Sequence, residues 1–286
     1  MLEPKFTFPK RILIAAFEGW NDAGEAASRA VAVVRDSLGL SSLFEVDSEL
    51  YFDYQFNRPT VGIREGSQRF ITWPSVQIFG PEGRRKNGIY VLTGTEPARN
   101  WKQFAREMLS LIDELGIEAV ITVGAMLADV PHTRPIAVFS SSDNEKLRLL
   151  DGVERSTYEG PIGILSVLGV SAEQLKLPAL SLWASVPHYV HNTPSPKAAL
   201  ALVEELEKFL NLTFAHGDLE KDAEEWVANI DSLAEEDEDM ARYIEQLEKA
   251  RDTVDSPEAS GEAIAEEFER YLRRRDGGKG ESKEPS

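Results

Sequence analysis

The chain of 286 residues contains no cysteine and only four histidines. The absence of cysteine excludes disulfides, thiolate nucleophiles and cysteine-ligated metals. It fits a protein of the cytoplasm, which is where we expect this chain to act. Apolar runs such as residues 12–17 have the length of a strand, far below the roughly 20 residues of a membrane-spanning helix. The first residues also lack the pattern of a signal peptide, so the sequence predicts no membrane association.

Positive charge is scarce, because 31 Lys and Arg stand against 49 Asp and Glu and give a net charge of −18. This balance argues against a broad electrostatic contact with nucleic acid or anionic lipid. Residues 216–286 hold 23 acidic and 10 basic side chains, and so carry −13 of the total. The shift predicts an α/β core domain over residues 1–215, an acidic helical extension over residues 216–275 and a disordered tail over residues 276–286.

Apolar runs of strand length alternate with helical patterns over the first 200 residues. Buried strands are predicted over residues 12–17, 89–94, 118–124, 136–142 and 178–187, and helices over residues 22–38, 98–115 and 197–210. Asp22 and Glu25 have the spacing of a capping box at the start of the first helix. Such alternation predicts a three-layer α/β/α sandwich with a mainly parallel central sheet, and an all-helical segment follows it.

Two segments depart from this alternation. Residues 43–80 contain short pieces rich in aromatic and β-branched residues, among them LYFDY, and predict an antiparallel excursion with a hairpin turn at residues 65–68. Residues 160–169 are ambiguous. Their glycines favour a strand that is followed by a loop or a short helix, with Ser171 as a cap for what comes next.

A repeated Val-Pro-His sequence indicates where a site would lie. ADVPH ends at His132 and ASVPH ends at His188, and each follows a predicted strand. In open α/β sheets, ligand sites form beyond the carboxyl ends of the strands. The loops that follow the first strand and the strand at residues 89–94 should reach the same edge. The candidate ligand-binding residues are therefore Gly19, Trp20, Asn21, Asp22, Gly94, Gly124, His132 and His188.

The chemistry of this edge stays open at the level of sequence. His132, His188 and Glu96 are the candidate acids or bases, but a histidine between prolines more often stabilises a turn. His188 and His191 form an HxxH pattern without a third ligand, and we expect no metal. The chain matches neither GxGxxG nor the P-loop pattern, nor the GxSxG elbow, so no cofactor is expected and no hydrolase triad is indicated. The sequence alone does not decide whether the protein is an enzyme.

Several ordered segments resemble one family. They are GWNDAGEAAS, LYFDYQFNRP, ITVGAMLADVPHTRP, SLWASVPHYVHNTPSPKAALALVEEL and GEAIAEEFERYL. Together they are similar to the PAC2 family of proteins related to proteasome assembly chaperone 2, and most of all to bacterial members with a C-terminal helical extension. The resemblance implies a nucleoside-phosphorylase-like core and self-association. Some archaeal relatives bind proteasomes through a hydrophobic-Tyr-X ending. This sequence ends in Lys-Glu-Pro-Ser, so docking by that route is not expected.

Two functions follow from these observations. The first is a non-catalytic, homo-oligomeric assembly or protein-binding factor of the chaperone type, which the resemblance and the absence of a catalytic motif favour. The alternative is an enzyme or sensor that binds a small anionic metabolite at the carboxyl edge of the sheet, akin to the phosphorylases and hydrolases of that fold or to family members labelled as ligases.

Overall fold

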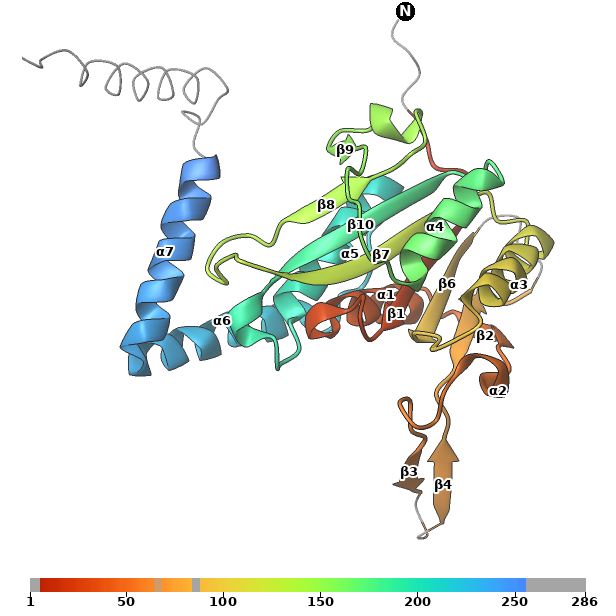
Figure 1. Ribbon diagram of the computed structural model, residues 1–286, viewed down its shortest axis with the longest axis horizontal. Helices are drawn as coiled ribbons and strands as arrows, with labels where there is room; N and C mark the ends of the chain where they lie inside the picture. The colour runs from red at the N-terminus through yellow and green to blue at the C-terminus, as the bar shows by residue number, and fades with distance from the viewer. Residues whose placement is uncertain (1–5, 65, 67, 84–87, 256–286) are drawn as a thin grey trace, which may run out of the picture. The chain divides into compact units, whose positions relative to one another are not determined.

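The computed structural model of the chain describes residues 6–64, 66, 68–83 and 88–255 (Figure 1). By packing, the chain divides into two compact units, Met1–Ser232 and Leu233–Ser286. An eight-stranded sheet of order β2-β5-β6-β1-β7-β10-β8-β9 dominates the first unit. Its strands are β1 (Arg11–Glu18), β2 (Ser41–Glu45), β5 (Val76–Gly80), β6 (Gly88–Thr95), β7 (Ala119–Ala128), β8 (Val138–Ser141), β9 (Val153–Glu154) and β10 (Ala179–Pro187).

The centre of the sheet is parallel, as the sequence predicted. β1 runs parallel to both β6 and β7, and β7 runs parallel to β10. β5 and β8 join this centre antiparallel, and β2 pairs antiparallel with β5. The predicted strand–helix–strand unit at residues 89–124 is present, but β1 is inserted between its two strands.

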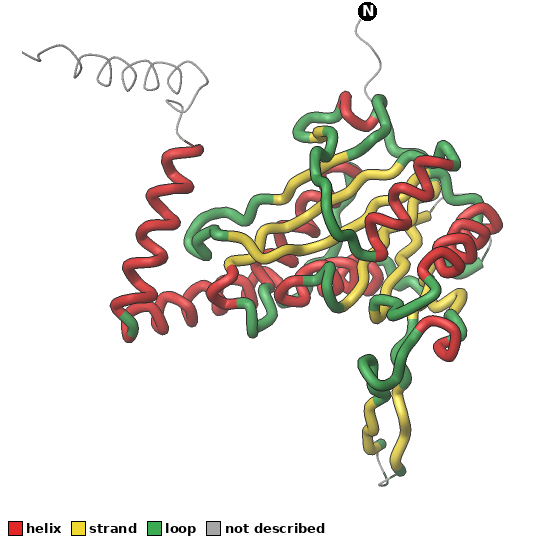
Figure 2. Tube along the Cα trace, viewed as in Figure 1, coloured by secondary structure: helices red, strands yellow, loops and turns green. Residues whose placement is uncertain are grey.

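Helices cover both faces of the sheet and make the three layers (Figure 2). α1 (Ala26–Ser37) and α5 (Pro196–Leu210) pack on one face, and α3 (Trp101–Glu114) and α4 (Ile164–Gln174) pack on the other. Successive residues of β1 alternate between the two layers: Ile12, Ile14 and Ala16 join the α1 and α5 side, and Leu13, Ala15 and Phe17 join the α3 and α4 side. A strand buried on both faces explains the unbroken apolar run.

The helical extension begins with α6 (Leu219–Glu236), and α7 (Glu238–Asp255) follows after a break at Asp237. The break falls in the acidic run EEDED at residues 235–239. Leu219 belongs to the core cluster of α1 and α5. Within the part of the chain that the structure describes, no helix is long and apolar enough to span a membrane. Residues 256–275 of the predicted helical extension and the predicted tail lie outside the described residues.

Three local predictions were wrong. LYFDY was assigned to the antiparallel excursion, but α2 (Ser48–Tyr51) occupies its start, where Asp47 accepts the N–H of Glu49. The ambiguous segment forms α4 from Ile164 onward, so Ser171 lies inside this helix. The capping box is also absent in its simple form, since the 3₁₀ turn η1 (Ala23–Glu25) intervenes and Glu25 itself occupies the N-cap position of α1.

The antiparallel excursion itself is confirmed. β3 (Thr60–Ile63) and β4 (Arg69–Thr72) form a hairpin that is a separate two-stranded sheet. Arg64 donates its backbone N–H to the carbonyl of Gln68, which closes the ladder toward the predicted turn. Glu65 and Ser67 of that turn lie outside the described residues. Two further 3₁₀ turns lie in the described part of the chain, η2 (Leu147–Leu149) and η3 (His188–Val190).

Candidate functional site

The carboxyl ends of β1, β6, β7 and β10 meet at one edge of the sheet. Phe17 pairs with Gly94, and Ala128 pairs with Pro187. β7 and β10 continue beyond the other two strands, so the last residue of β7 lies about 10 Å past the end of β1 at the usual rise per residue. The two Val-Pro-His segments reach this projecting end together, as the strand directions predicted.

The loop after β1 divides into an exposed and a buried half. Trp20 is 64% exposed, whereas Asn21 is fully buried and its carbonyl accepts the N–H of Ala125. The Oδ1 atom of Asp22 accepts the N–H groups of Ala27 (2.7 Å) and Ser28 (3.2 Å), so it caps α1 from four residues upstream of that helix. Burial raises the pKa of Asp22 above its usual value. The two buried side chains therefore hold the loop in place.

Glu96 joins this loop to the opposite helix layer. Its Oε1 atom accepts the side-chain amide of Asn21 (2.7 Å) and the backbone N–H of Ile164 (2.9 Å). Ile164 is the first residue of α4, where free N–H groups and the helix dipole favour a negative charge. The carboxylate thus satisfies a helix start that has no side-chain cap of its own. This geometry supports a structural role for Glu96, and its role as an acid or base remains a prediction.

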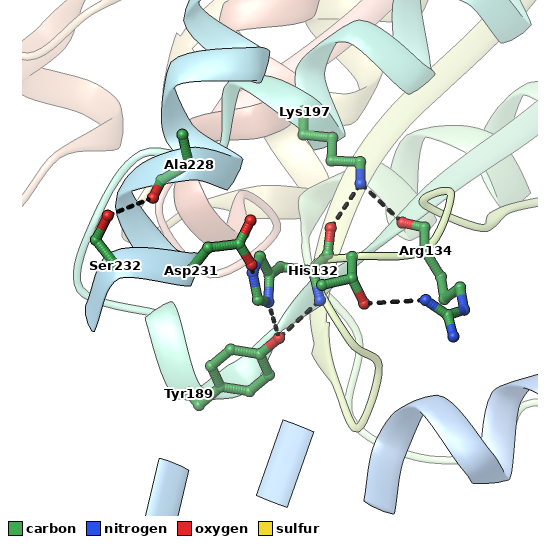
Figure 3. Close-up of polar contacts among 8 residues, drawn as sticks. His132, Arg134, Tyr189, Lys197, Ala228, Asp231 and Ser232 are labelled. Carbon is green, nitrogen blue, oxygen red and sulfur yellow. Dashed lines mark hydrogen bonds and ion pairs between the residues drawn. The ribbon is translucent and has the colours of Figure 1, made fainter. Parts of the chain in front are cut away.

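His132 lies at the centre of the densest polar cluster of the edge (Figure 3). Its side chain is buried, with its Nε2 atom 3.0 Å from Oδ1 of Asp231 and its Nδ1 atom 2.8 Å from the hydroxyl of Tyr189. The same hydroxyl accepts the backbone N–H of His132 at 2.6 Å. Because a carboxylate only accepts, Nε2 carries a proton, and the Tyr189 hydroxyl has its own proton to donate to Nδ1.

Three further contacts complete the cluster. Lys197 of α5 donates to the carbonyl oxygens of His132 (2.5 Å) and Arg134 (2.9 Å), and burial lowers the pKa of its amine. The indole of Trp226 meets the imidazole edge-on at 6.2 Å between centroids. The cluster therefore ties the loop after β7 to η3, α5 and α6. The imidazole is covered on both nitrogens, and this arrangement fits a structural latch better than a group that meets a substrate.

The second histidine of the pair is more open. His188 places Nδ1 3.2 Å from a carboxylate oxygen of Asp129, and its side chain is 43% exposed. His191 uses its own Nδ1 to contact the carbonyl of His188 within η3. Among the described residues, no group of three His, Cys, Asp or Glu side chains is placed to hold a metal ion. Gly124 is buried in β7, and the Trp183 ring lies where a β-carbon would stand.

Gly94 opens onto a different feature, a hollow of about 730 Å³ beside the ends of β1, β5 and β6. At Gly94 the backbone has φ +146°, and a β-carbon would come within 2.1 Å of the Ser75 carbonyl oxygen, so only glycine fits. Arg29, Arg35 and Arg58 line the hollow. Arg29 is paired with Asp222 of α6 and Arg35 lies over the Phe79 ring, whereas Arg58 makes no ion pair with a described residue.

The sequence analysis missed the partners that give His132 its surroundings. Tyr189, Lys197 and Asp231 come from three later elements, and the last lies 99 residues from the histidine. Of these three residues, only Tyr189 could have been found from the sequence, because it directly follows the second Val-Pro-His segment. The arginines of the hollow were missed as well, since Arg29 and Arg58 come from α1 and the start of the hairpin, which show no motif.

The layers and the edge define a class of protein: a three-layer α/β fold with a mainly parallel sheet, whose carboxyl edge holds a buried histidine cluster and an open hollow. The PAC2 family matches residues 16–234. The chain belongs to the PAC2 family.

Solved structures agree with this assignment. A PAC2 family protein from Streptomyces avermitilis is 41% identical, with a TM-score of 0.74, over 82% of this chain and 99% of that one. A proteasome-assembly chaperone homologue from Mycobacterium tuberculosis is 38% identical, with a TM-score of 0.73 and the same coverage. A protein of unknown function from Corynebacterium glutamicum is 25% identical, with a TM-score of 0.75 over 87% of this chain and 92% of that one. No curated protein matches the chain.

Proposed function

We propose that the chain is a protein-binding factor of the assembly-chaperone type that acts without catalysis and as a homo-oligomer. The observation that carries this proposal is the similarity to the proteasome-assembly chaperone homologue of M. tuberculosis, at 38% identity over nearly the whole of that protein. Relatives at this level of identity share their fold. An assembly factor acts through the binding surfaces that this fold presents.

The edge of the sheet supports the non-catalytic part of the proposal. A general acid or base must come within hydrogen-bond reach of a substrate. The imidazole of His132 is fully buried, and Asp231 and Tyr189 occupy its two nitrogens. Glu96 is committed to Asn21 and to the start of α4. Two of the three candidate acids and bases of the sequence are therefore used inside the fold, and the third, His188, is 43% exposed beside Asp129.

The test is reconstitution with a proteasome core particle. Purified chain is added to separate α and β subunits of that particle, and complexes are followed by size-exclusion chromatography with light scattering. We expect a complex with unassembled or half-assembled subunits and a faster appearance of the complete particle. An unrelated acidic protein of similar isoelectric point controls for charge. If the chain neither binds the subunits nor alters their rate of assembly, this function is refuted.

The arginine-lined hollow favours a second candidate, a sensor or enzyme for a small anionic metabolite. Three guanidinium groups border a space large enough for such a ligand, and guanidinium groups bind carboxylate and phosphate oxygens with two parallel hydrogen bonds. Inorganic phosphate, nucleotides and dicarboxylates are the probes, and thermal unfolding is the measurement, since a ligand that binds only the folded state raises its stability.

Two variants make this second test specific. Arg58→Ala should abolish any thermal shift, because Arg58 is the lining arginine without an ion pair among the described residues. Arg155→Ala, which removes an exposed arginine outside the hollow, should leave it unchanged. A panel without any shift would remove this candidate.

A further inference from the structure

The β3–β4 hairpin stands apart from the large sheet (Figure 1). Val61 pairs with Ile71, and Ile63 pairs with Arg69. A two-stranded hairpin on its own is at best marginally stable in water, because it has too little apolar surface to bury. A surface that packs against this hairpin would therefore stabilise it.

The two faces of the hairpin differ. On one face, the Phe70 ring lies over Gly62, where a β-carbon would come within 2.4 Å of the ring, and the Arg64 guanidinium lies 4.8 Å from the centre of that ring. The apolar surface of this face is therefore covered by side chains of the hairpin itself. The other face presents Val61 and Ile63, which are 56% and 73% exposed. Three further alternating positions extend this face along β4 and just beyond it.

Those positions are Arg69, Ile71 at 57% exposure and Trp73 at 47%. We call Val61, Ile63, Arg69 and Ile71 the hairpin face. Residues of alternating position share one side of a strand, so their apolar groups form one patch. Exposed patches of this kind mark interaction surfaces.

The charge of the hairpin is opposite to that of the chain. Residues 56–73 contain three arginines and one glutamate, a net charge of +2. The net charge of the whole chain is −18, so the residues outside this segment carry a net charge of −20. A surface that complements the hairpin face must be apolar and acidic, and a second copy of this chain offers acidic surface at the same concentration as the hairpin itself.

The carboxyl edge of the sheet has the required composition. Trp20 and Leu127 are 64% and 48% exposed. Because side chains alternate along a strand, Leu127 shares the α1 and α5 side of the sheet with Ala125. The backbone bond from Ala125 to Asn21 holds the Trp20 loop against the end of β7. The exposed carboxylates of Glu18 and Asp129 flank these residues in the chain. We call Glu18, Trp20, Leu127 and Asp129 the rim patch.

We propose that the hairpin face of one copy docks on the rim patch of a second copy. The proposal rests on the self-association proposed above and names the two surfaces that make it. Apolar side chains then meet apolar side chains, and arginine meets carboxylate. Docking of two hairpin faces on each other is less favourable, because each brings an arginine and neither brings an acid. In a pair joined by such a contact, one copy still has a free hairpin face and the other a free rim patch, so further copies can add. If the rotation between successive copies closes, the result is a ring.

The experiment uses one variant for each surface. Ile63→Ser with Ile71→Ser disables the hairpin face, and Trp20→Ser with Leu127→Ser disables the rim patch. Sedimentation velocity at micromolar concentration measures the assembly state. We expect an oligomer for the natural chain and a monomer for each variant. A 1:1 mixture of the two variants should give a dimer, since one intact contact remains.

The matched control is Val170→Ser with Leu175→Ser. These two side chains, in and just after α4, are 50% and 66% exposed and belong to neither surface. This variant should keep the oligomer of the natural chain. Circular dichroism checks that all three variants remain folded.

A second measurement does not depend on the serine variants. The chain has no cysteine, so a thiol appears only where it is introduced. A short bis-maleimide should join Ile63→Cys protein to Leu127→Cys protein in a mixture, and should join neither variant to itself.

The outcomes separate the two proposals. A monomeric natural chain overturns both the self-association and the docking. An oligomeric natural chain whose hairpin variant stays oligomeric, or a variant mixture that yields neither dimer nor cross-link, overturns the docking alone. A monomeric hairpin variant with a dimeric mixture establishes the contact between unlike surfaces.

Discussion

The surroundings of His132 are made by residues that are far away in the sequence. The strand before it and the prolines around it place the ring at the edge of the sheet, and this much the pattern predicted. Its burial follows from Tyr189 and Asp231, which lie 57 and 99 residues further along the chain. A single sequence carries no signal for such pairs, so the contacts of this histidine could not be predicted from the sequence.

The Tyr189 hydroxyl provides a direct test of the latch. Tyr189→Phe keeps the ring but leaves the backbone N–H of His132 without its acceptor. An unsatisfied polar group in a covered position costs about 1–3 kcal/mol, so urea denaturation should show a loss of that size in the free energy of unfolding. Tyr158→Phe is the control, because that tyrosine is 63% exposed and its hydroxyl can turn to water. Equal effects of the two substitutions would exclude the latch.

His216 introduces a pH dependence at the start of α6. Burial alone would lower its pKa, but hydrogen bonds to the carboxylates of Glu207 and Glu220 outweigh it and raise the pKa in the folded chain. A raised folded-state pKa gives stability that is complete below the unfolded value near 6.5, and the stability is lost as pH rises through the folded value.

We therefore expect His216→Gln to lower the free energy of unfolding by about 1 kcal/mol at pH 5.5 and hardly at all at pH 9. Urea titrations at the two pH values measure the difference. His191→Gln is the control for the loss of an exposed histidine. A His216→Gln effect that is the same at both pH values would contradict the assignment.

At the scale of elements, apolar patterning was a good guide to the core. The unbroken run of β1 and the helical spacing of α3 and α5 were predicted because burial on two faces, or along one stripe, leaves a direct trace in the sequence. α4 was missed because glycines at its start and in its middle weaken a helical pattern. α2 was missed because a single turn is too short to show a period.

The order of the strands was beyond the sequence. β1 lies between β6 and β7, and no local pattern tells a chain which neighbours a strand will take. For the same reason, the shared edge of four loops could be predicted from strand direction alone, but the hollow at Gly94 could not. The hollow depends on the antiparallel addition of β5 beside β6.

Gly94 tests that junction. Gly94→Ala would place a β-carbon against the Ser75 carbonyl of the neighbouring segment at a φ that L-residues rarely adopt. We expect a loss of about 3 kcal/mol or more, measured by urea denaturation. Gly169→Ala in α4 is the matched control, because its β-carbon meets nothing within 4 Å and alanine favours a helix, so it should stabilise by up to about 1 kcal/mol. A tolerated Gly94→Ala would refute the close approach.

At the scale of the whole molecule, charge and packing place the division of the chain differently. The acidic composition begins near residue 216, whereas packing divides the chain after Ser232. The first part of α6 carries both properties. Its outer residues are acidic, and its inner residues Leu219, Ala223, Trp226 and Ile230 are buried. The acidic composition of this segment comes from the residues on the solvent face of α6 and does not report how the helix packs. The domain boundary predicted at residue 215 remains a prediction, and stability measurements can test it.

Two truncations make that test. A chain that ends at Ser232 keeps Trp226 and the Asp231 carboxylate that meets His132, and it should unfold cooperatively with a midpoint near that of the full chain. A chain that ends at Ala215 loses the burial of Leu219, Trp226 and Ile230, at about 1.5–3 kcal/mol each, and exposes the core beneath them. Its free energy of unfolding should fall by about 5 kcal/mol, measured by urea denaturation with circular dichroism. If both truncated chains were equally stable, the first part of α6 would be dispensable, and the boundary would lie where the charge changes.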